Sequence, residues 1–443
     1  MAVELLNSAL LKPPTLGAAA DCTPFVPLTI FDRAAFDLHV PSLYAFLPPT
    51  PSNHSLKSGL SRVLHLFPHL AGRMATDDLR RPCILLNNAG VRVIETSVSA
   101  ALSEMLPLDA TSDLSELHSP VGDDVEELLQ VQFNRYSCGG LVIGLTSHHR
   151  VADGQSMSLF FAAWAQAVRL GEVTGPRPFL DRAAVGVPRN PLRVEFNHRE
   201  VEFRAPPTSP KSVAPAAVCA VENLKVRFSG DFIEKLKALV PFRCSTFECL
   251  LAHLWRKISA ARGLDGAATT KVRVAVNGRA RMKPAVPMEF FGNLVLWAHP
   301  RTTVEELNST GSGINGLAEA ARIIHEAVQS IDDRYFRSFI DFGEAEKAGR
   351  KDDDDDDDLV ATAPATGNML CPDLEVDSWL RFNFHDLDFG GGPPCAFLPP
   401  NLPVEGLMIF VPSVEEKGGV DVFMALAVEH VGLFKKCCYS LDY

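Results

Sequence analysis

The spacing of apolar residues predicts three amphipathic helices. In each of them apolar positions recur every three to four residues, which places them on one helix face. The stretches with this spacing are 55–66, 155–170 and 245–262. The third begins at Ser245 or Thr246 and has Glu248 close behind, an order of residues typical of a capping box. All three predicted helices therefore begin and end at recognisable points in the sequence.

Short apolar runs predict strands between these helices. Residues 140–147 (GLVIGLTS) form an apolar run opened by two glycines, and residues 219–228 alternate between apolar and polar side chains. The first of these strands, followed by the helix at 155–170, places His149 in a strand-to-helix turn. Strands and helices are mixed in both halves of the chain, so the pattern predicts an α/β protein.

The length of 443 residues exceeds what one hydrophobic core usually supports, so we expect two domains. Prolines cluster between Gly175 and Pro215, which favours an extended crossing segment over a regular element. We therefore predict an N-terminal domain at 1–180, a crossover at 181–215 and a C-terminal domain at 216–443.

A run of aspartates, Asp352–Asp358, interrupts the second half. Seven like charges cannot pack against one another, so we expect a disordered, solvated acidic loop near 350–360. Gathering of cationic substrates is a rival interpretation, but salt screens such charges beyond about 8 Å, and nothing connects the run to a pocket.

Composition and charge exclude several classes of protein. The chain is 47% hydrophobic and 22% charged, which fits a folded protein. Its net charge is -12 and it has no basic cluster, which argues against nucleic-acid binding. The ten cysteines form no CxxC pair, so we expect no metal site and reduced thiols. No stretch has the pattern of a targeting or membrane-spanning segment, so we expect a cytoplasmic protein with no membrane partner.

His149 and Asp153 stand four residues apart in the segment Ser147–Gly154. Alone this spacing means little, because a chain with 13 histidines is expected to contain one such pair by chance. Other segments add context, in this order along the chain: Leu70-Ala71-Gly72-Arg73, Ser245-Thr246-Phe247-Glu248, Asn277-Gly278-Arg279, Phe291-Gly292-Asn293, Ser378-Trp379 and Asp388-Phe389-Gly390. Together with His149 and Asp153 they resemble the motifs of the BAHD acyltransferase family, over essentially the whole chain.

The resemblance implies two similar chloramphenicol-acetyltransferase-like domains, with mixed sheets flanked by helices and a tunnel between the domains. It implies acyl-CoA as co-substrate, no bound cofactor, and a monomer. His149 would be the general base. Asp153 would turn away from His149 and pair with Arg279 in a structural role. The segment Asp388-Phe389-Gly390 would support the site, although Gly391 stands where the family usually has tryptophan.

The chemistry agrees independently, because transfer from a thioester to an alcohol or amine needs a base near neutrality, and histidine suits that task. No G-x-S-x-G segment is present, so a hydrolase with a nucleophilic serine is a minor alternative. His148 would point to the opposite face of the strand and be structural. Ser245 and Thr246, at a helix N-terminus, would face coenzyme A, or they are a plain helix cap.

The residues that suggest the acceptor lie in the second half of the chain. The stretch from Leu374 to Gly392 resembles the grass amine N-hydroxycinnamoyltransferases, whose acceptors include agmatine, putrescine and tryptamine. A strand over 374–382 would place four side chains on one face: Glu375, Asp377, Trp379 and Arg381. Trp379 would form an aromatic wall, and Glu375 would hold the far cationic end of the amine.

Arg381 favours a different acceptor, because it matches the arginine that holds the shikimate carboxylate in shikimate-specific members of the family. Ester formation on a hydroxyl acceptor such as shikimate is therefore an alternative to amide formation. A non-catalytic relative that binds CoA esters or a protein partner is a third interpretation. No residue in the sequence fixes the acyl donor, although hydroxycinnamoyl and benzoyl groups suit the branch.

Overall fold

A computed structural model describes residues 2–441, apart from 15–23, 79, 107–113, 123, 205–219, 310–315, 350–358, 362–368, 383–386 and 400. The predicted acidic loop and the second part of the predicted crossover lie outside the described residues. Both halves of the chain form mixed β-sheets flanked by helices, so the predicted fold class is confirmed.

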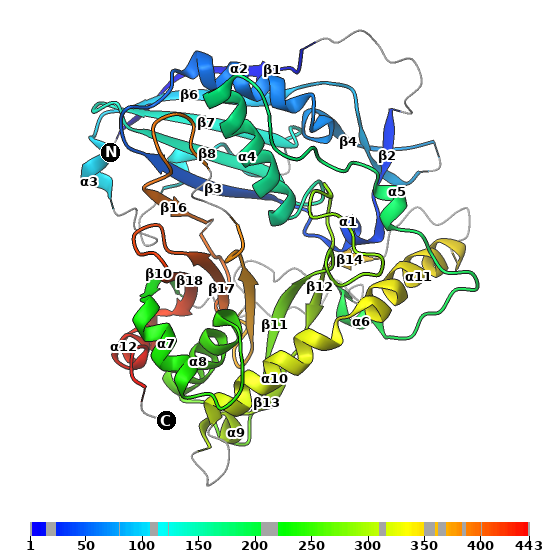
Figure 1. The fold of residues 1–443 in the computed structure, drawn as a ribbon, viewed down its shortest axis with the longest axis vertical. Helices are drawn as coiled ribbons and strands as arrows, with labels where there is room; N and C mark the ends of the chain where they lie inside the picture. Colours follow the sequence, from blue (N-terminus) through cyan, green and yellow to red (C-terminus); the bar gives the residue numbers. More distant parts are fainter. Residues whose placement is uncertain are drawn as a thin grey trace.

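Two large sheets organise the described part of the chain (Figure 1). The first runs in the order β1 (Val3–Leu11), β6 (Val91–Val98), β7 (Leu129–Tyr136), β8 (Leu141–His148), β3 (His39–Phe46) and β16 (Ala396–Leu398). The second runs in the order β10 (Val221–Phe228), β18 (Val420–Ala427), β17 (Leu407–Pro412), β15 (Leu374–Ser378), β11 (Thr269–Asn277) and β12 (Val295–Ala298), and β13 (Arg301–Thr303) pairs with β11. Each sheet contains parallel and antiparallel pairs.

The longer helices cover these sheets. In Figure 1, α2 (Asn53–Leu64) and α4 (Gly154–Leu170) lie against the first sheet, and α7 (Gly230–Ala238), α8 (Thr246–Ala261) and α10 (Gly316–Ser330) lie beside the second. The other elements are α1 (Ile30–Ala34), α3 (Leu102–Met105), α5 (Arg182–Val185), α6 (His198–Val201), α9 (Val304–Asn308), α11 (Asp333–Gly349), α12 (Val428–Cys437), the 3-10 turns Pro68–Ala71 and Ser115–Leu117, and the short strands β2 (Phe25–Pro27), β4 (Arg73–Thr76), β5 (Pro82–Leu85), β9 (Phe203–Arg204) and β14 (Val360–Ala361).

The three helices predicted from apolar spacing are confirmed. Ser52 caps α2, where its hydroxyl accepts the Ser55 amide at 3.1 Å. Ser245 and Glu248 form the predicted capping box of α8. The apolar faces of α2, α4 and α8 are buried. Local capping and apolar periodicity were thus sufficient to place these helices.

The halves of the chain are not separate in space. Residues 396–398, far along the C-terminal half, form β16 and pair with β3 in the first sheet. Strand β18 is buried on both faces: Val422, Met424 and Leu426 belong to the core of the second half, and Phe423 and Ala425 to that of the first. Its apolar run from Val422 to Ala427 reflects this double burial.

The strand predicted at 374–382 ends four residues early, at Ser378. Trp379 donates its backbone N–H to the carbonyl of Phe410 at 2.8 Å, and the chain then turns, so that the Phe382 amide donates to the Trp379 carbonyl at 2.9 Å. Arg381 therefore leaves the face that it would share with Glu375, and the predicted common face was wrong at that position.

The Asp388–Gly392 loop leaves no room for a side chain at Gly391. The Asp388 carboxylate accepts the amides of Gly390 and Gly392 at 2.8 Å and pairs with Arg169 of α4 at 3.1 Å. A Cβ on Gly391 would lie 1.9 Å from the carbonyl oxygen of Pro49. A side chain at Gly391 therefore requires the backbone around Pro49 to move.

We expect Gly391→Ala to lower the free energy of unfolding by about 1–3 kcal/mol, because the new methyl group is forced against a backbone carbonyl. Gly122→Ala is the matched control, since a Cβ there meets nothing within 4 Å. Chemical denaturation of both variants and the wild type measures the difference. Equal stability of the two variants would contradict this account of the loop.

Candidate active site

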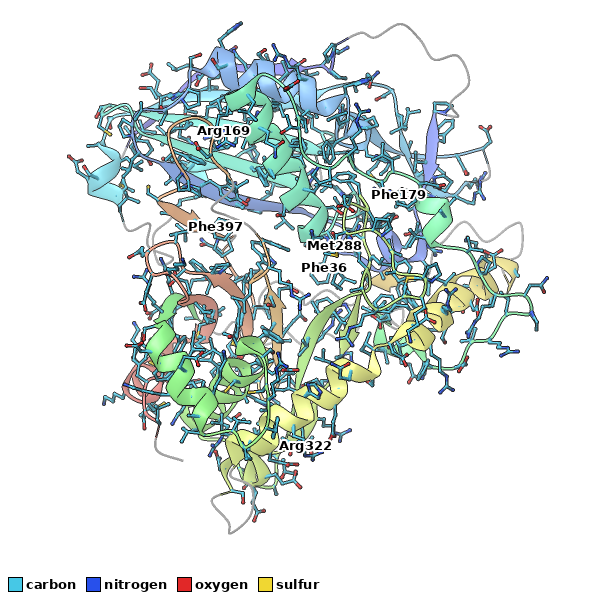
Figure 2. The ribbon with its side chains drawn as sticks, viewed as in Figure 1. Phe36, Arg169, Phe179, Met288, Arg322 and Phe397 are labelled. Atoms are coloured by element: carbon cyan, nitrogen blue, oxygen red, sulfur yellow. The ribbon has the colours of Figure 1, made fainter. Side chains whose placement is uncertain are left out.

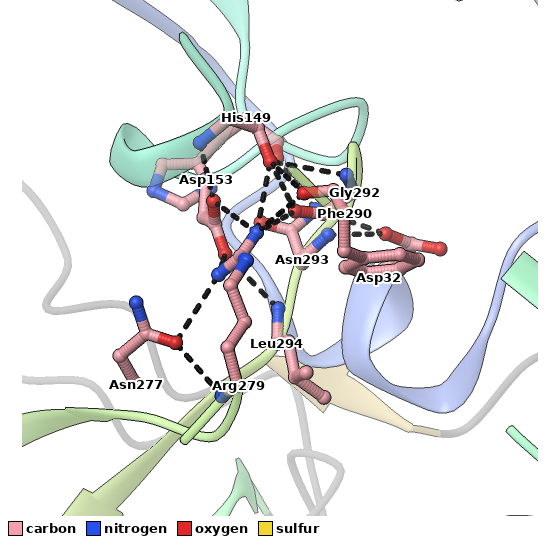
Figure 3. A network of polar contacts seen from close by, with 10 residues as sticks. Asp32, His149, Asp153, Asn277, Arg279, Phe290, Gly292, Asn293 and Leu294 are labelled. Carbon is pink, nitrogen blue, oxygen red and sulfur yellow. Dashed lines mark hydrogen bonds and ion pairs between the residues drawn. The ribbon is translucent and has the colours of Figure 1, made fainter. Parts of the chain in front are cut away.

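His149 is held in the turn between β8 and α4 by both halves of the chain. Its backbone N–H donates to the carbonyl of Leu38 at 2.9 Å. Its carbonyl accepts the side-chain amide of Asn293 at 3.0 Å (Figure 3). The strand ends at His148 and the helix begins at Gly154, so His149 lies in the strand-to-helix turn where the sequence placed it. The backbone of His149 is therefore held by the first half and by the turn that carries Asn293.

The imidazole of His149 is in the state required of a base. Burial lowers its pKa below the usual value, so the ring is neutral at pH 7. Nδ1 is buried and accepts or donates no hydrogen bond within the described part of the chain. This leaves Nε2 as the ring nitrogen that can take a proton from an acceptor.

Asp153 does not orient His149. Its Oδ1 accepts the Ser156 amide at 2.9 Å and Nη2 of Arg279 at 3.0 Å, and its Oδ2 accepts Nη1 of Arg279 at 2.8 Å and the Leu294 amide at 3.1 Å. A carboxylate has about four acceptor positions, and these bonds occupy them. The Asp153–Arg279 pairing agrees with what the family resemblance implies.

Arg279 is fully buried, and its other hydrogen bonds lie within the same cluster (Figure 3). Nη2 also donates to the Ser156 hydroxyl at 2.9 Å and to the Phe290 carbonyl at 2.9 Å. Nη1 reaches the Asn277 side chain at 3.3 Å. A forked guanidinium on a carboxylate fixes relative orientation as well as distance, so this cluster connects the start of α4 to the turn after β11.

The sequence did not reveal a second buried ion pair next to the turn. Asp32 pairs with Arg182 at 3.0 Å, and its Oδ1 accepts the backbone and side-chain amides of Asn293 at 3.1 and 3.0 Å. Thr29 and Asp32 have the spacing of a capping box, which the structure confirms for α1. That spacing predicts a helix start and gives no sign that Asp32 contacts a residue 261 positions away.

Two cavities meet at His149. The first lies between β3, β8 and α4 on one side and β11, β12 and β15 on the other, and Tyr44, Leu145 and Phe161 give it an apolar wall. The second extends from His149 toward residues 398–399 and 401–404. Phe36 lies between the two sheets (Figure 2), and its ring is 5.6 Å from that of His149.

The second cavity carries two carboxyl groups from β15, Glu375 and Asp377. Glu375 accepts Nη1 of Arg273 at 3.1 Å, and that guanidinium stacks 3.8 Å from the ring centre of Trp297. Burial, and next the neighbouring Glu375, raise the pKa of Asp377 to about 7. No Lys or Arg is among the described residues that line either cavity.

The other predicted site residues fall into two groups. Trp379 lines both cavities, and its ring lies 5.7 Å from that of Phe382. Arg381 is exposed and lines neither cavity. Ser245 and Thr246 also line neither, and the Ser245 hydroxyl donates to Glu248 at 2.7 Å. Contact of Ser245 and Thr246 with coenzyme A stays a prediction.

His148 lines neither cavity; its Nε2 lies 3.4 Å from Asp37, and its ring packs edge-on against that of His39. The described residues contain no group of three or more His, Cys, Asp or Glu placed to hold a metal ion. No helix in the described ranges is long and apolar enough to cross a membrane.

Comparison with known proteins gives three findings. The Transferase family model matches residues 3–441. Tryptamine hydroxycinnamoyltransferase 2 of Oryza sativa subsp. japonica is 49% identical and agmatine coumaroyltransferase-1 of Hordeum vulgare 44%, each over 100% of both chains. The crystal structure of vinorine synthase superposes with a TM-score of 0.73 at 21% identity, covering 98% of this chain and 96% of the other.

We expect Asp153→Asn to lower the free energy of unfolding by about 3 kcal/mol, because the buried Arg279 charge loses its partner. Asp37→Asn is the control: its carboxylate is 59% exposed and forms a surface pair with Arg150, so its loss should cost under about 1 kcal/mol. Urea denaturation measures both. A loss no larger for Asp153→Asn than for Asp37→Asn would contradict the assigned role.

Proposed function

The chain belongs to the BAHD family of CoA-dependent transferases, and from this membership we propose that it transfers an aromatic acyl group from coenzyme A to a small amine. The acyl group is of the hydroxycinnamoyl or benzoyl type. The product is an amide, and the acceptor class includes agmatine, putrescine and tryptamine. Relatives whose names carry these amines support the choice of class.

His149 is the general base of the proposed reaction. As the amine nitrogen attacks the thioester carbonyl, Nε2 takes a proton from it, and a tetrahedral oxyanion forms. Collapse of this intermediate breaks the C–S bond, and the CoA sulfur leaves as a thiol with a proton from His149. No acyl-enzyme is needed, because the amine attacks the thioester directly. The apolar wall at Tyr44, Leu145 and Phe161 suits an aromatic acyl group.

The charge of the cavities is the observation on which the choice of an amine depends. The described residues that line them include carboxyl groups, Glu375 and Asp377 in the second cavity, and no Lys or Arg. Acidic groups in an apolar chamber favour a cationic acceptor and disfavour an anionic one, which would need a basic partner. The alternative acceptor, shikimate, depends on Arg381, which is exposed and outside both cavities.

We place the protein in the cytoplasm, acting as a monomer. The described cysteines are free thiols, which fits a reducing compartment.

The deciding experiment offers coumaroyl-, feruloyl- and benzoyl-CoA to the purified protein with agmatine, putrescine, tryptamine, tyramine or shikimate. We expect amide products by mass spectrometry, and a loss of at least about 100-fold in kcat for His149→Ala. A shikimate ester would support hydroxyl transfer instead. Equal CoA release by wild type and His149→Ala would support a binding protein without turnover.

Glu375→Gln tests how a second cation is recognised. We expect kcat/KM to fall by about 10–100-fold for agmatine and putrescine, because a hydrogen bond between charged groups contributes about 1.5–3 kcal/mol. Tryptamine has no second cation, so its kcat/KM should change little. Steady-state kinetics with all three amines measures the difference. A similar fall for tryptamine would contradict recognition of the far cation by Glu375.

A further inference from the structure

Six residues line both cavities, and they mark the place where the acyl carbon and the acceptor must meet. They are Phe36, Val40, Ser42, His149, Asp377 and Trp379. Among these six, His149 and Asp377 are the two with side chains that can take up and release a proton by ordinary acid–base titration. A reaction at this junction therefore has two proton-accepting side chains available, one from each half of the chain.

An amine that binds as an ammonium ion has two protons to lose in forming an amide, whereas an alcohol has one to lose in forming an ester. A primary alkylamine has a pKa near that of lysine, about 10.4, so at pH 7 it arrives as an ammonium ion without a lone pair. It must lose one proton before it can attack and a second as the amide forms. His149 can accept only one proton at a time, so the first proton needs a different acceptor.

We propose that Asp377 is a second catalytic base, which takes the first proton from the ammonium form of the acceptor. This role rests on the proposed amine acceptor. The N–H bond of the ammonium breaks and the carboxylate of Asp377 gains the proton. The neutral amine then attacks the thioester, His149 takes the second proton, and the leaving sulfur receives that proton from His149. Asp377 returns its proton to solvent, so the net products are amide, thiol and one proton.

The surroundings of Asp377 suit a group that both takes and releases a proton. The titratable and charged groups facing it are Glu375 on the same strand, Arg273 on β11 and His149 beyond β8, with His39 and His118 farther along the second cavity. Glu375 already pairs with Arg273 at 3.1 Å, whereas Asp377 faces the junction. With a pKa raised to about 7, Asp377 is an effective proton acceptor at neutral pH.

The test compares Asp377→Asn with wild type, using benzoyl-CoA and two acceptors of one shape, phenethylamine and β,β-difluorophenethylamine. Two fluorines lower the amine pKa, so the second acceptor is largely unprotonated at pH 7. We expect kcat for phenethylamine to fall about 100-fold at pH 7 with little change in KM, and to recover as the pH approaches 10. For the fluorinated amine, kcat of Asp377→Asn at pH 7 should fall far less.

Asp373→Asn is the matched control, because that carboxylate precedes the same strand, pairs with Lys271 and lines neither cavity. Its kcat should match that of wild type with both amines. If Asp377→Asn does not fold, Asp377→Ala provides a second variant, and added formate should restore its kcat with phenethylamine in proportion to formate concentration.

The remaining outcomes distinguish a failure of the Asp377 role from a failure of the proposed function. An equal loss of kcat with both amines, or a raised KM with kcat intact, would overturn the role of Asp377 and leave the amine acceptor standing. Values of kcat and KM in Asp377→Asn equal to those of wild type would also overturn the role of Asp377 and leave the amine acceptor standing. Absence of amide from the wild type with these and all other amines would overturn the proposed function, and the second base with it.

Discussion

The buried ion pair between Asp153 and Arg279 is the interaction on which the rest of the site depends. It joins the first turn of α4 to the turn after β11, which lies 126 residues farther along the chain. Both partners are almost completely buried, so neither charge can fall back on water if the pair is broken. The guanidinium also holds the carbonyl of Phe290, and the carboxylate holds the amide of Leu294. The pair therefore fixes two segments of the second half against the start of one helix.

In the proposed reaction His149 acts as base without an acidic partner, because the ion pair with Arg279 occupies Asp153 fully. In a triad, a carboxylate would hold the imidazole and stabilise its charged form. Here the aspartate of the motif is turned to the arginine, and burial keeps the imidazole neutral. Asn293, itself held by Asp32, donates its side-chain amide to the backbone carbonyl of His149. The ion pairs thus hold the segment that carries His149 in place, and the neutral imidazole is able to accept a proton.

The cavities combine an apolar wall from the first half with carboxyl groups from the second. Strand β15 carries Glu375 and Asp377 to the second cavity, and it ends at Ser378, before Arg381. A strand four residues longer would put a cation on the same face as the two carboxyl groups. The early end of this strand therefore sets the charge that an acceptor meets, and in the proposed function it favours amines over anionic alcohols.

The sequence by itself determined the fold class, the three principal helices, the strand-to-helix turn at His149 and the family. These features depend on apolar periodicity, on caps such as Ser245 with Glu248, and on motifs in a fixed order, all of which act over a few residues. Only the tertiary structure decided that Asp32 holds Asn293, that β16 joins the first sheet, and that Gly391 packs against Pro49. It also decided that Asp377 stands at the junction of the cavities while Arg381 stays outside. The reason is physical, because each of these contacts joins groups that are far apart in the chain. A local pattern of residues does not indicate which distant backbone or side chain will lie against it.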